Sequence, residues 1–285
     1  MFTKLRAWPV IAVLALVAAV FVAAGCGGDD GGDGGGGGVN TITEGELRVG
    51  SDIPYPPFEF GRAPDYEGFD VDIVNEIAQR LDLEAQFVKT PFDPIFRNLA
   101  QGRFDMVASA ATITPERERT VDFSEPYFPA DQSLMVKRGS DIRTVEDVAG
   151  QTIGAQLGTT GADYAKDETD AETVRTYDLV DDAFKALQAG QIEAVINDFP
   201  VSKYAERSKP DLVVVETIET NENYGLAFAQ DSTALRDRVN EALAEMKQDG
   251  TYTRIYRKWF EVDPPERILQ TDGGSDSADG GSQGT

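Results

Sequence analysis

One phrase occurs twice in this chain, and it strongly limits the folds that the chain can adopt. Residues 96–107 read FRNLAQGRFDMV and residues 184–195 read FKALQAGQIEAV, with a constant offset of 88 residues. Seven positions match in identity or in chemical type. Each copy combines a helix, a glycine that can end the helix in a left-handed conformation, and a short apolar strand. Such phrases recur by chance in α/β proteins, but seven matches in register favour two α/β lobes.

The chain between residues 42 and 268 alternates short apolar runs with helical patterns, as an α/β fold requires. Apolar residues recur with helical spacing over 70–82, where we predict a helix with Phe69 as a hydrophobic staple and Asp70 as the N-cap. Each lobe is expected to be an open sheet that helices cover on both faces. The predicted strands are 47–51, 85–90, 104–109, 152–156, 193–197, 212–216 and 225–229.

The ends of two equivalent strands indicate where a ligand would bind. In open α/β sheets, ligands lie beyond the carboxyl ends of the strands. The strands of the two repeat copies end at Ser109-Ala110 and at Asn197-Asp198. If the lobes face each other, these ends oppose each other across a cleft. We therefore predict one ligand between two lobes.

Charge and composition exclude several classes of protein. The formal net charge is −24 and no basic stripe is present, which argues against nucleic-acid binding. The chain has no histidine, which excludes histidine-based acid–base and triad catalysis. A single cysteine removes most zinc sites. We predict no metal and no cofactor.

The N-terminus is typical of an export signal. A basic start is followed by an apolar run that ends in AAGC at 23–26, where the only cysteine of the chain stands. This stretch resembles a bacterial lipoprotein signal, which implies removal of residues 1–25 and lipidation of Cys26. Ala23 stands where such signals usually have leucine, and an uncleaved anchor helix is the alternative. The segment 26–41 is expected to be a flexible tether and 265–285 a disordered tail.

An arginine in the segment 109–127 is a candidate to bind an anion. Thr114-Pro115 is expected to open a helix and to place Arg117 near its third position, where a cation opposes the helix dipole. The guanidinium fork suits a carboxylate, because it can donate two hydrogen bonds to it. A surface ion pair with a neighbouring acidic residue is the alternative.

Two further segments supply pocket-forming groups. In SDIPYPPFEF, residues 51–60, Tyr55 and Phe58 are candidates to wall a pocket, although Phe58 would equally well cover a lobe. Asp52 in the same segment is a candidate to meet a cationic or amide group. In GAQLGTTGADY, residues 154–164, a strand, a glycine and two threonines form an anion-friendly turn that lacks the lysine of a nucleotide P-loop.

A carboxylate completes the set of candidate groups. Asp198 ends the second repeat strand and is suited to bind an ammonium group, with capping of the next helix as the alternative. Together with Arg117 and the threonine turn, it complements the two charges of an α-amino acid.

Five motifs in the same order resemble those of one family: GFDVDIVNEIAQRL (68–81), ITPER (113–117), VDFSEPY (121–127), GTT (158–160) and DGTYTRIYRKWF (249–260). The resemblance covers nearly all of 42–264. It is to the extracellular solute-binding proteins of family 3, which are the receptors for polar amino acids of ABC importers. It implies a two-lobed, periplasmic-binding-protein-like fold of type II with two hinge strands.

The resemblance also implies roles for particular residues. Arg117 would grip the α-carboxylate of the ligand, helped by the Thr112 hydroxyl and by the backbone at Ala110 and Thr160. Ala110 replaces the serine or glycine often found there, so only its backbone can contribute. Asp198 would hold the α-ammonium. The residues expected around the ligand side chain are Tyr55 and Phe92, which would sandwich it, and Asp52, Ser109, Gln156 and Asn197, which would line its far end.

The implied hinge crossings lie near 133–138 and 219–226. Lobe 1 would then comprise 42–133 and 227–264, and lobe 2 would comprise 134–226. Lys137 and Arg138 are expected on the hinge.

Function follows from the same resemblance. We predict a monomeric receptor outside the cytoplasm, anchored to the cell membrane by its lipid, that delivers a cationic or amide amino acid to an ABC permease. We predict that it is not an enzyme. The alternatives are a dehydratase of the same fold that acts on a cyclic carboxylic acid, and an amino-acid sensor without a role in transport.

Overall fold

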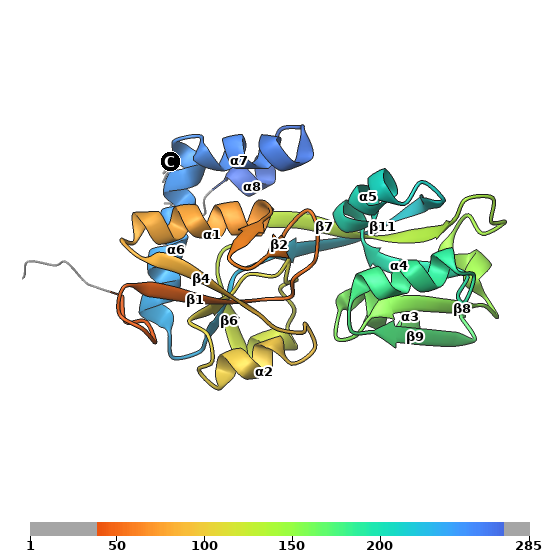
Figure 1. Ribbon diagram of the computed structural model, residues 1–285, viewed down its shortest axis with the longest axis horizontal. Coiled ribbons are helices and arrows are strands. Elements are labelled where there is room, and N and C mark those ends of the chain that lie inside the picture. The colour runs from red at the N-terminus through yellow and green to blue at the C-terminus, as the bar shows by residue number, and fades with distance from the viewer. Residues whose placement is uncertain (1–38, 271–285) are drawn as a thin grey trace, which may run out of the picture. The chain divides into compact units, whose positions relative to one another are not determined.

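The two copies of the repeated phrase lie in two different sheets (Figure 1). The computed structural model describes residues 39–270, so the predictions for residues 1–38, Cys26 among them, and for 271–285 lie outside the described residues. The first sheet has the order β4 (Glu84–Lys89), β1 (Glu46–Ser51), β5 (Met106–Val107), β12 (Ala227–Ala229) and β6 (Val121–Phe123). The second has the order β11 (Leu212–Tyr224), β7 (Phe128–Lys137), β10 (Ala194–Asp198), β8 (Thr152–Gln156) and β9 (Thr173–Tyr177).

Helices pack on both sheets, as the alternating pattern predicted. We call the first sheet with its helices lobe 1 and the second sheet with its helices lobe 2. The helices of lobe 1 are α1 (Phe69–Arg80), α2 (Ile95–Ala100), α6 (Thr233–Gln248), α7 (Thr251–Phe260) and α8 (Glu266–Leu269), beside the hairpin of β2 (Phe60–Arg62) and β3 (Asp65–Glu67). The helices of lobe 2 are α3 (Thr160–Asp167), α4 (Val180–Gln188) and α5 (Phe199–Ser208). Two 3₁₀ turns lie at Arg117–Arg119 and Val145–Val148.

The repeated phrase has the same local structure in both lobes. Helix α2 ends before Gly102 and α4 before Gly190, and both glycines have a φ of +69°. The following strands, β5 and β10, pair in parallel with β1 and β8 respectively. The prediction of one open α/β unit per copy is therefore confirmed.

A bulky apolar residue after each of these glycines packs against a glycine of the neighbouring strand. A Cβ atom on Gly50 would lie 2.6 Å from the Phe104 ring, and one on Gly154 would lie 2.5 Å from the Ile192 side chain. Both distances are shorter than any van der Waals contact, so a side chain at either glycine would displace its neighbour. The Phe104 ring is rigid and leaves no room at Gly50, whereas the atom nearest to Gly154 is the end of the Ile192 side chain, which can move.

Two long antiparallel strands, β7 and β11, connect the lobes (Figure 1). Residues 132–136 of β7 already pair with β10 inside the second sheet. The pairing of β11 with β7 is interrupted between Ile218 and Glu222. We therefore define the hinge as residues 128–131 and 219–224, so that the first crossing comes earlier in the chain than the predicted 133–138.

The two basic residues expected on the hinge lie elsewhere. Lys137 is the last residue of β7, where its Nζ donates to the Gln188 carbonyl, and Arg138 Nε donates to the Pro210 carbonyl. The expectation was wrong because β7 extends for ten residues and carries them to the far end of lobe 2.

The start of α1 differs from the prediction. The N-cap is Gly68, and Phe69 is fully buried among the aromatic residues of lobe 1 instead of forming a staple. A side chain at position 68 would overlap the carbonyl oxygen of Phe58, at 1.9 Å, so only glycine fits there. Asp70 does not cap the helix, because its carboxylate accepts hydrogen bonds from the Ala110 N–H and the Tyr127 hydroxyl, each at 2.8 Å.

The C-terminal segment is ordered further than predicted. Residues 265–270 were expected to belong to a disordered tail, yet 266–269 form α8. Ile268 is 3% exposed and packs on the core of lobe 1. Its apolar contact explains the difference, since polar residues alone would not fix the chain there.

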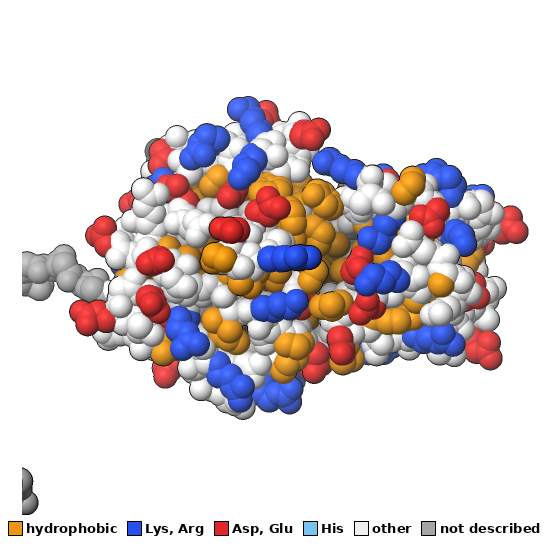
Figure 2. Space-filling model, viewed as in Figure 1, with side chains coloured by type: hydrophobic (Ala, Val, Ile, Leu, Met, Phe, Trp, Pro, Cys, Tyr) orange, Lys and Arg blue, Asp and Glu red, His pale blue; other side chains and the backbone are white. Residues whose placement is uncertain are grey.

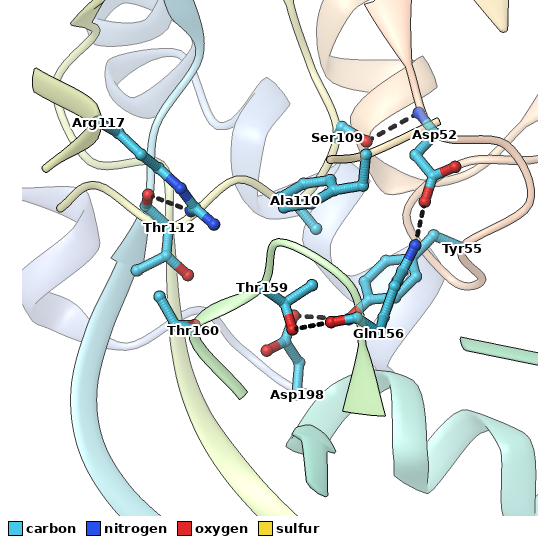
Figure 3. Close-up of a pocket in the computed structure, with 11 residues that line it drawn as sticks. Asp52, Tyr55, Ser109, Ala110, Thr112, Arg117, Gln156, Thr159, Thr160 and Asp198 are labelled. Carbon is cyan, nitrogen blue, oxygen red and sulfur yellow. Dashed lines mark hydrogen bonds between the residues drawn. The ribbon is translucent and has the colours of Figure 1, made fainter. Parts of the chain in front are cut away.

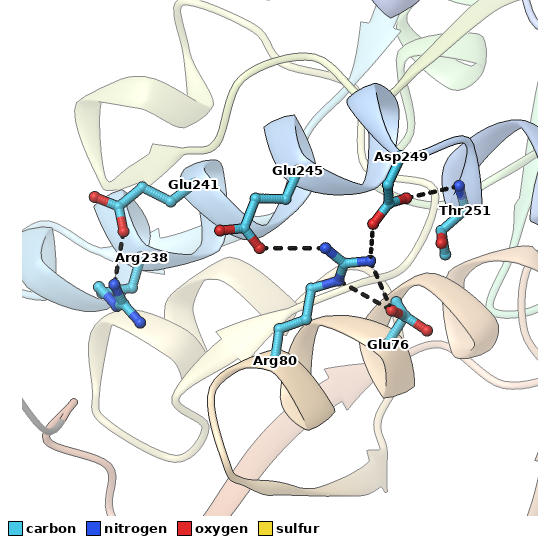
Figure 4. A network of polar contacts seen from close by, with 7 residues as sticks. All are labelled: Glu76, Arg80, Arg238, Glu241, Glu245, Asp249 and Thr251. Carbon is cyan, nitrogen blue, oxygen red and sulfur yellow. Dashed lines mark hydrogen bonds and ion pairs between the residues drawn. The ribbon is translucent and has the colours of Figure 1, made fainter.

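An arginine at the end of α1 ties this helix to α6 (Figure 4). Arg80 contacts Glu76 at 2.9 Å, Glu245 at 3.2 Å and Asp249 at 2.6 Å. Asp249 also accepts from the Thr251 N–H at 2.9 Å, where α7 begins. The hydrogen bond from Arg80 lowers the pKa of Asp249 to about 2.

Candidate functional site

A narrow pocket lies between the lobes, where the strand ends of the two repeat copies meet. Its cavity volume is about 10 Å³. A cavity of that size holds about one water molecule, so the lobes are closed over the pocket and must part to admit a larger ligand. Figure 3 shows how the side chains converge on it. Its walls are Asp52, Tyr55, Phe92, Ser109, Ala110, Thr112, Arg117, Gln156, Thr159, Thr160 and Asp198.

The structure thus brings together all the predicted site residues except one. Asn197 does not line the pocket and lies behind Tyr55, whose hydroxyl donates to Asn197 Oδ1 at 3.0 Å. Phe58, an earlier candidate, is fully buried among the aromatic residues of lobe 1. Of the two alternatives for Phe58, covering the lobe is therefore the correct one, and walling the pocket is not.

Arg117 supplies the cation of the pocket. Its guanidinium carbon lies 5.2 Å from the centre of the Phe92 ring and 4.8 Å from that of Phe96, within the range of cation–π contacts. Nη1 donates to the Thr112 carbonyl at 2.7 Å, and Nη2 donates across the cleft to the Gly158 carbonyl at 3.1 Å. Burial lowers the pKa of this guanidinium, although nearby acidic groups oppose the shift.

The alternative of a surface ion pair is not realised. Within residues 39–270, Arg117 forms none of the ion pairs that the structure contains. The helix predicted to begin at Thr114-Pro115 does not form. A single 3₁₀ turn lies at 117–119 in its place. The Arg117 N–H still donates to Thr114 Oγ1, at 3.2 Å, although the N-cap of this turn is Glu116.

Asp198 supplies a carboxylate from lobe 2. It is 7% exposed, and its oxygens accept from Tyr224 Oη at 2.5 Å, Gln132 Nε2 at 2.6 Å and Tyr55 Oη at 2.7 Å. Burial raises its pKa to about 6, with a further contribution from the charge of Glu222. Asp198 is the N-cap residue of α5, as the capping alternative expected, but its side chain makes no capping hydrogen bond to that helix, so capping does not account for the carboxylate.

The far end of the pocket is also acidic. Asp52 Oδ2 accepts from Gln156 Nε2 across the cleft at 2.5 Å, and Gln156 also donates to the Asp178 carbonyl at 2.9 Å. The Ser109 hydroxyl accepts from the Asp52 N–H at 2.9 Å. It donates to Glu59, which lies directly behind the pocket. Burial raises the pKa of Asp52 to about 6 and that of Glu59 well above its usual range.

The two threonines of the turn, Thr159 and Thr160, make different hydrogen bonds. Thr159 is the N-cap of α3, and its hydroxyl accepts from the Ala162 N–H at 3.1 Å. Thr160 is the first residue of α3, and its hydroxyl donates to Glu222 at 2.8 Å. The backbone of this turn lies at the positive end of the helix dipole, which favours an anion.

One predicted backbone contact is not available as expected. The N–H of Ala110 donates to Asp70 at 2.8 Å, so that donor is already engaged inside lobe 1. Ala110 lines the pocket and has a φ of +43°, in the left-handed region. The sequence did not predict that Asp70 would accept a hydrogen bond from the Ala110 N–H, because the Asp70 side chain was expected to cap α1.

Sequence reasoning missed the polar residues of the hinge strands. Gln132 on β7 and both Glu222 and Tyr224 on β11 hydrogen bond to residues that line the pocket. No local pattern identifies them, since their positions depend on how the two long strands pair. Thr159 also lines the pocket, and the paired threonines were its only signal.

Other kinds of site find no support in residues 39–270. No cluster of three or more carboxylate or cysteine groups is placed to hold a metal ion. None of the described helices is long and apolar enough to cross a membrane. On the face in Figure 2, small groups of basic side chains are interspersed with acidic ones, without a continuous basic stripe.

A polar pocket enclosed by two α/β lobes on a two-stranded hinge defines a solute-binding protein. The sequence profile of the bacterial extracellular solute-binding proteins, family 3, matches residues 47–262. The chain belongs to this family, as its motifs indicated.

Comparison with individual proteins agrees with the family. The chain is 32% identical over 221 residues to ABC transporter arginine-binding protein 1 of Escherichia coli K12, covering 75% of this chain and 90% of the relative. It is 38% identical to the crystal structure of an ancestral arginine-binding protein bound to glutamine, with a TM-score of 0.74 and coverage of 77% and 100%. It is 39% identical to the ancestral amino-acid-binding protein AncCDT-1, a precursor of cyclohexadienyl dehydratase, with a TM-score of 0.71 and coverage of 76% and 96%. These relatives are binding proteins, in agreement with the prediction that the chain is not an enzyme.

Proposed function

We propose that this protein is the receptor of an ABC importer for an α-amino acid that carries a cationic or amide side chain. The observation that carries the proposal is the placement of Arg117 and Asp198. They belong to different lobes, yet both line one pocket. A ligand with a carboxylate and an ammonium on the same carbon can pair with both at once.

Lobe closure follows from this arrangement. Arg117 is held by lobe 1 and Asp198 by lobe 2. A ligand that binds both makes its full set of contacts only when the lobes are close together. Because a ligand shifts a conformational equilibrium by its differential affinity for the two states, the amino acid favours the closed form. We propose rotation at the hinge as the motion, with the protein acting as a monomer.

The side chain of the ligand is proposed from the charges at the far end of the pocket. We propose that Asp52 and the amide of Gln156 meet a cationic or amide group, and that Tyr55 and Phe92 enclose the methylene chain. The support is that all four residues line the pocket. A ligand with a second carboxylate would lie against Asp52 without a cation to pair with it. Arginine, lysine and glutamine therefore fit better than glutamate. The relatives named for arginine support this class.

The cellular setting is proposed from the sequence. The lipoprotein-like signal and Cys26 would anchor the protein to the outer face of the cell membrane, beside the permease that receives the ligand. Metabolic labelling with an alkyne fatty acid tests the anchor. Label on the unaltered protein but none on Cys26→Ser supports it, and equal labelling of both contradicts it.

The ligand assignment is tested by a thermal-shift screen against the twenty amino acids, since binding to the folded state raises the unfolding midpoint. Arginine, lysine or glutamine should give the largest shift. A shift with none of the twenty would refute the proposal.

A second candidate is a dehydratase acting on a cyclic carboxylic acid, which the likeness to AncCDT-1 brings into consideration. The buried acid Glu59 lies near the pocket and is a candidate proton donor. Asp198 disfavours this reading, because a substrate without an ammonium would leave a buried carboxylate facing an anion. Incubation with prephenate, followed by ultraviolet detection of an aromatic product, separates the two.

A further inference from the structure

Glu222 occupies a position from which it contacts both lobes. It lies on β11 inside the hinge and is half-buried. Its Oε2 accepts from the Thr112 hydroxyl of lobe 1 at 2.8 Å and from the Thr160 hydroxyl of lobe 2 at 2.8 Å. Both threonines line the pocket. Glu222 itself does not line that pocket, so it acts on a ligand through these two residues.

The number of protons on each threonine hydroxyl determines which hydrogen bonds it can still make to a ligand. A threonine hydroxyl has one proton to donate and two lone pairs that accept. A carboxylate oxygen can only accept, so the contact with Glu222 uses the proton of each hydroxyl. The lone pairs of Thr112 then remain for the pocket. A hydroxyl in this state receives a hydrogen bond from an ammonium and cannot donate one to a carboxylate.

Gln132 extends this arrangement to Asp198. Its Nε2 donates to Asp198 Oδ1 at 2.6 Å and approaches Glu222 Oε2 at 3.4 Å, so one amide separates the two carboxylates. It also donates to Thr160 Oγ1 at 3.3 Å, which takes up part of that hydroxyl's accepting capacity. Of these two hydroxyls of the pocket wall, Thr112 is therefore the one whose lone pairs are not shared with Gln132.

We propose that Glu222 is a positioning residue that takes the hydroxyl proton of Thr112 and so makes Thr112, together with Asp198, the seat of the ligand's α-ammonium. This rests on the proposed function. It also changes the role of Thr112, which the family resemblance placed with the α-carboxylate. Arg117 and the N-terminus of α3 then bind the carboxylate, and the hinge strand sets the preference for ligands that carry an ammonium.

The test compares each amino acid with the same molecule without its amino group. Titration calorimetry would measure L-arginine against 5-guanidinopentanoate, and L-glutamine against glutaramate. In Glu222→Gln, the affinity for the amino acid should fall about tenfold, because the two hydroxyls then donate to a neutral oxygen and each of these hydrogen bonds becomes weaker. The affinity for the deaminated partner should change less than about threefold, because it has no ammonium to place. Glu219→Gln, which removes the same charge from an exposed position of β11, is the matched control.

A double-mutant cycle with Thr112→Val separates positioning from charge alone. If Glu222 acts through Thr112, the valine substitution should cost much less in the Glu222→Gln background than in the unaltered protein. Additive effects would overturn the positioning role. Equal losses for the amino acid and its deaminated partner would show a merely structural role and would also overturn it.

The outcomes distinguish this inference from the function on which it rests. If the unaltered protein binds neither amino acid, the proposed function fails and takes the inference with it. If it binds one of them and Glu222→Gln binds that amino acid equally well, the inference alone fails. Unfolding midpoints of all variants establish that the compared proteins are folded.

Discussion

Replacement of Gly158 by alanine should impair closure of the cleft more than it impairs folding. Gly158 precedes the threonine turn of lobe 2 and has a φ of +79°. A Cβ there would lie 3.0 Å from Asp93 Cα and 3.2 Å from Asp93 Oδ1, and Asp93 belongs to lobe 1. The substitution therefore introduces two costs: backbone strain at a left-handed position, and a tight contact with the opposite lobe.

The two costs appear in different measurements. The strain, about 1–2 kcal/mol, is present whether the lobes are open or closed, so it lowers the free energy of unfolding and leaves affinity unchanged. The contact exists only when the lobes are together. Overpacking of this kind costs about 1–3 kcal/mol, and because its closest partner is a backbone atom, little of it can be relieved by side-chain rotation. Affinity should fall about 5- to 150-fold.

Gly150→Ala is the matched control. Gly150 also belongs to lobe 2 and has a φ of +71°, but nothing lies within 4 Å of a Cβ placed there. Chemical denaturation should show similar losses of stability for the two variants, whereas calorimetry with the amino acid found in the screen should show weakened binding only for Gly158→Ala. Equal affinities in the two variants would refute the idea that lobe 1 and lobe 2 touch at this point in the bound form.

Three further outcomes are expected. In calorimetry, Arg117→Ala should lower the affinity for the amino acid at least about a hundredfold, since removal of one partner of a buried charged pair costs about 2–5 kcal/mol. Arg119→Ala, which changes an exposed arginine nearby, should bind the amino acid normally. Affinity for L-arginine should fall as the pH drops through about 6, because burial raises the pKa of both Asp52 and Asp198 to that value and a protonated carboxyl cannot pair with a cation. Asp52→Asn should weaken this pH dependence and leave the part due to Asp198, and an unchanged pH dependence in that variant would exclude a contribution from Asp52. Arg80→Ala should make the stability of the fold less sensitive to acid between about pH 4 and pH 2, as measured by circular dichroism. In the unaltered protein the pKa of Asp249 is lowered from 3.8 to about 2, so its carboxylate stabilises the fold above that pH range and loses this effect as it is protonated. An unchanged acid profile in the variant would contradict this account.

The parts of the fold that depend on local pattern could be predicted from the sequence. The repeated phrase identified both α/β units because glycine after an amphipathic helix and an apolar strand are local signals. Strand β9 was missed, since its residues alternate between exposed and half-buried and give no apolar run. The start of α1 was predicted wrongly. Asp70 was predicted as the N-cap because aspartate is a common capping residue, whereas the close approach of the Phe58 carbonyl to Gly68 makes glycine the N-cap.

The candidate site was predictable where one residue carries a distinctive group. Arg117 and Asp198 stand at strand ends or in turns with few competing explanations. The roles of Gln132 and Glu222 were not predictable, because they arise from the pairing of β7 with β11, whose register shifts beside the pocket. The engaged N–H of Ala110 also escaped prediction, since it depends on a carboxylate forty residues away in the chain.

Because the chain crosses the hinge only twice, lobe 2 is formed by one continuous segment of the sequence. Between the two crossings, residues 132–218 run without returning to lobe 1, and they carry Gln156, Thr160 and Asp198. Arg117 and the aromatic walls remain in the surrounding segments. A recombination event with only two junctions could therefore exchange Asp198 and one wall of the pocket while it kept Thr112, Glu222 and the arginine proposed to bind the carboxylate. In such a chain, the groups proposed for the two charges of an amino acid can be inherited in separate pieces.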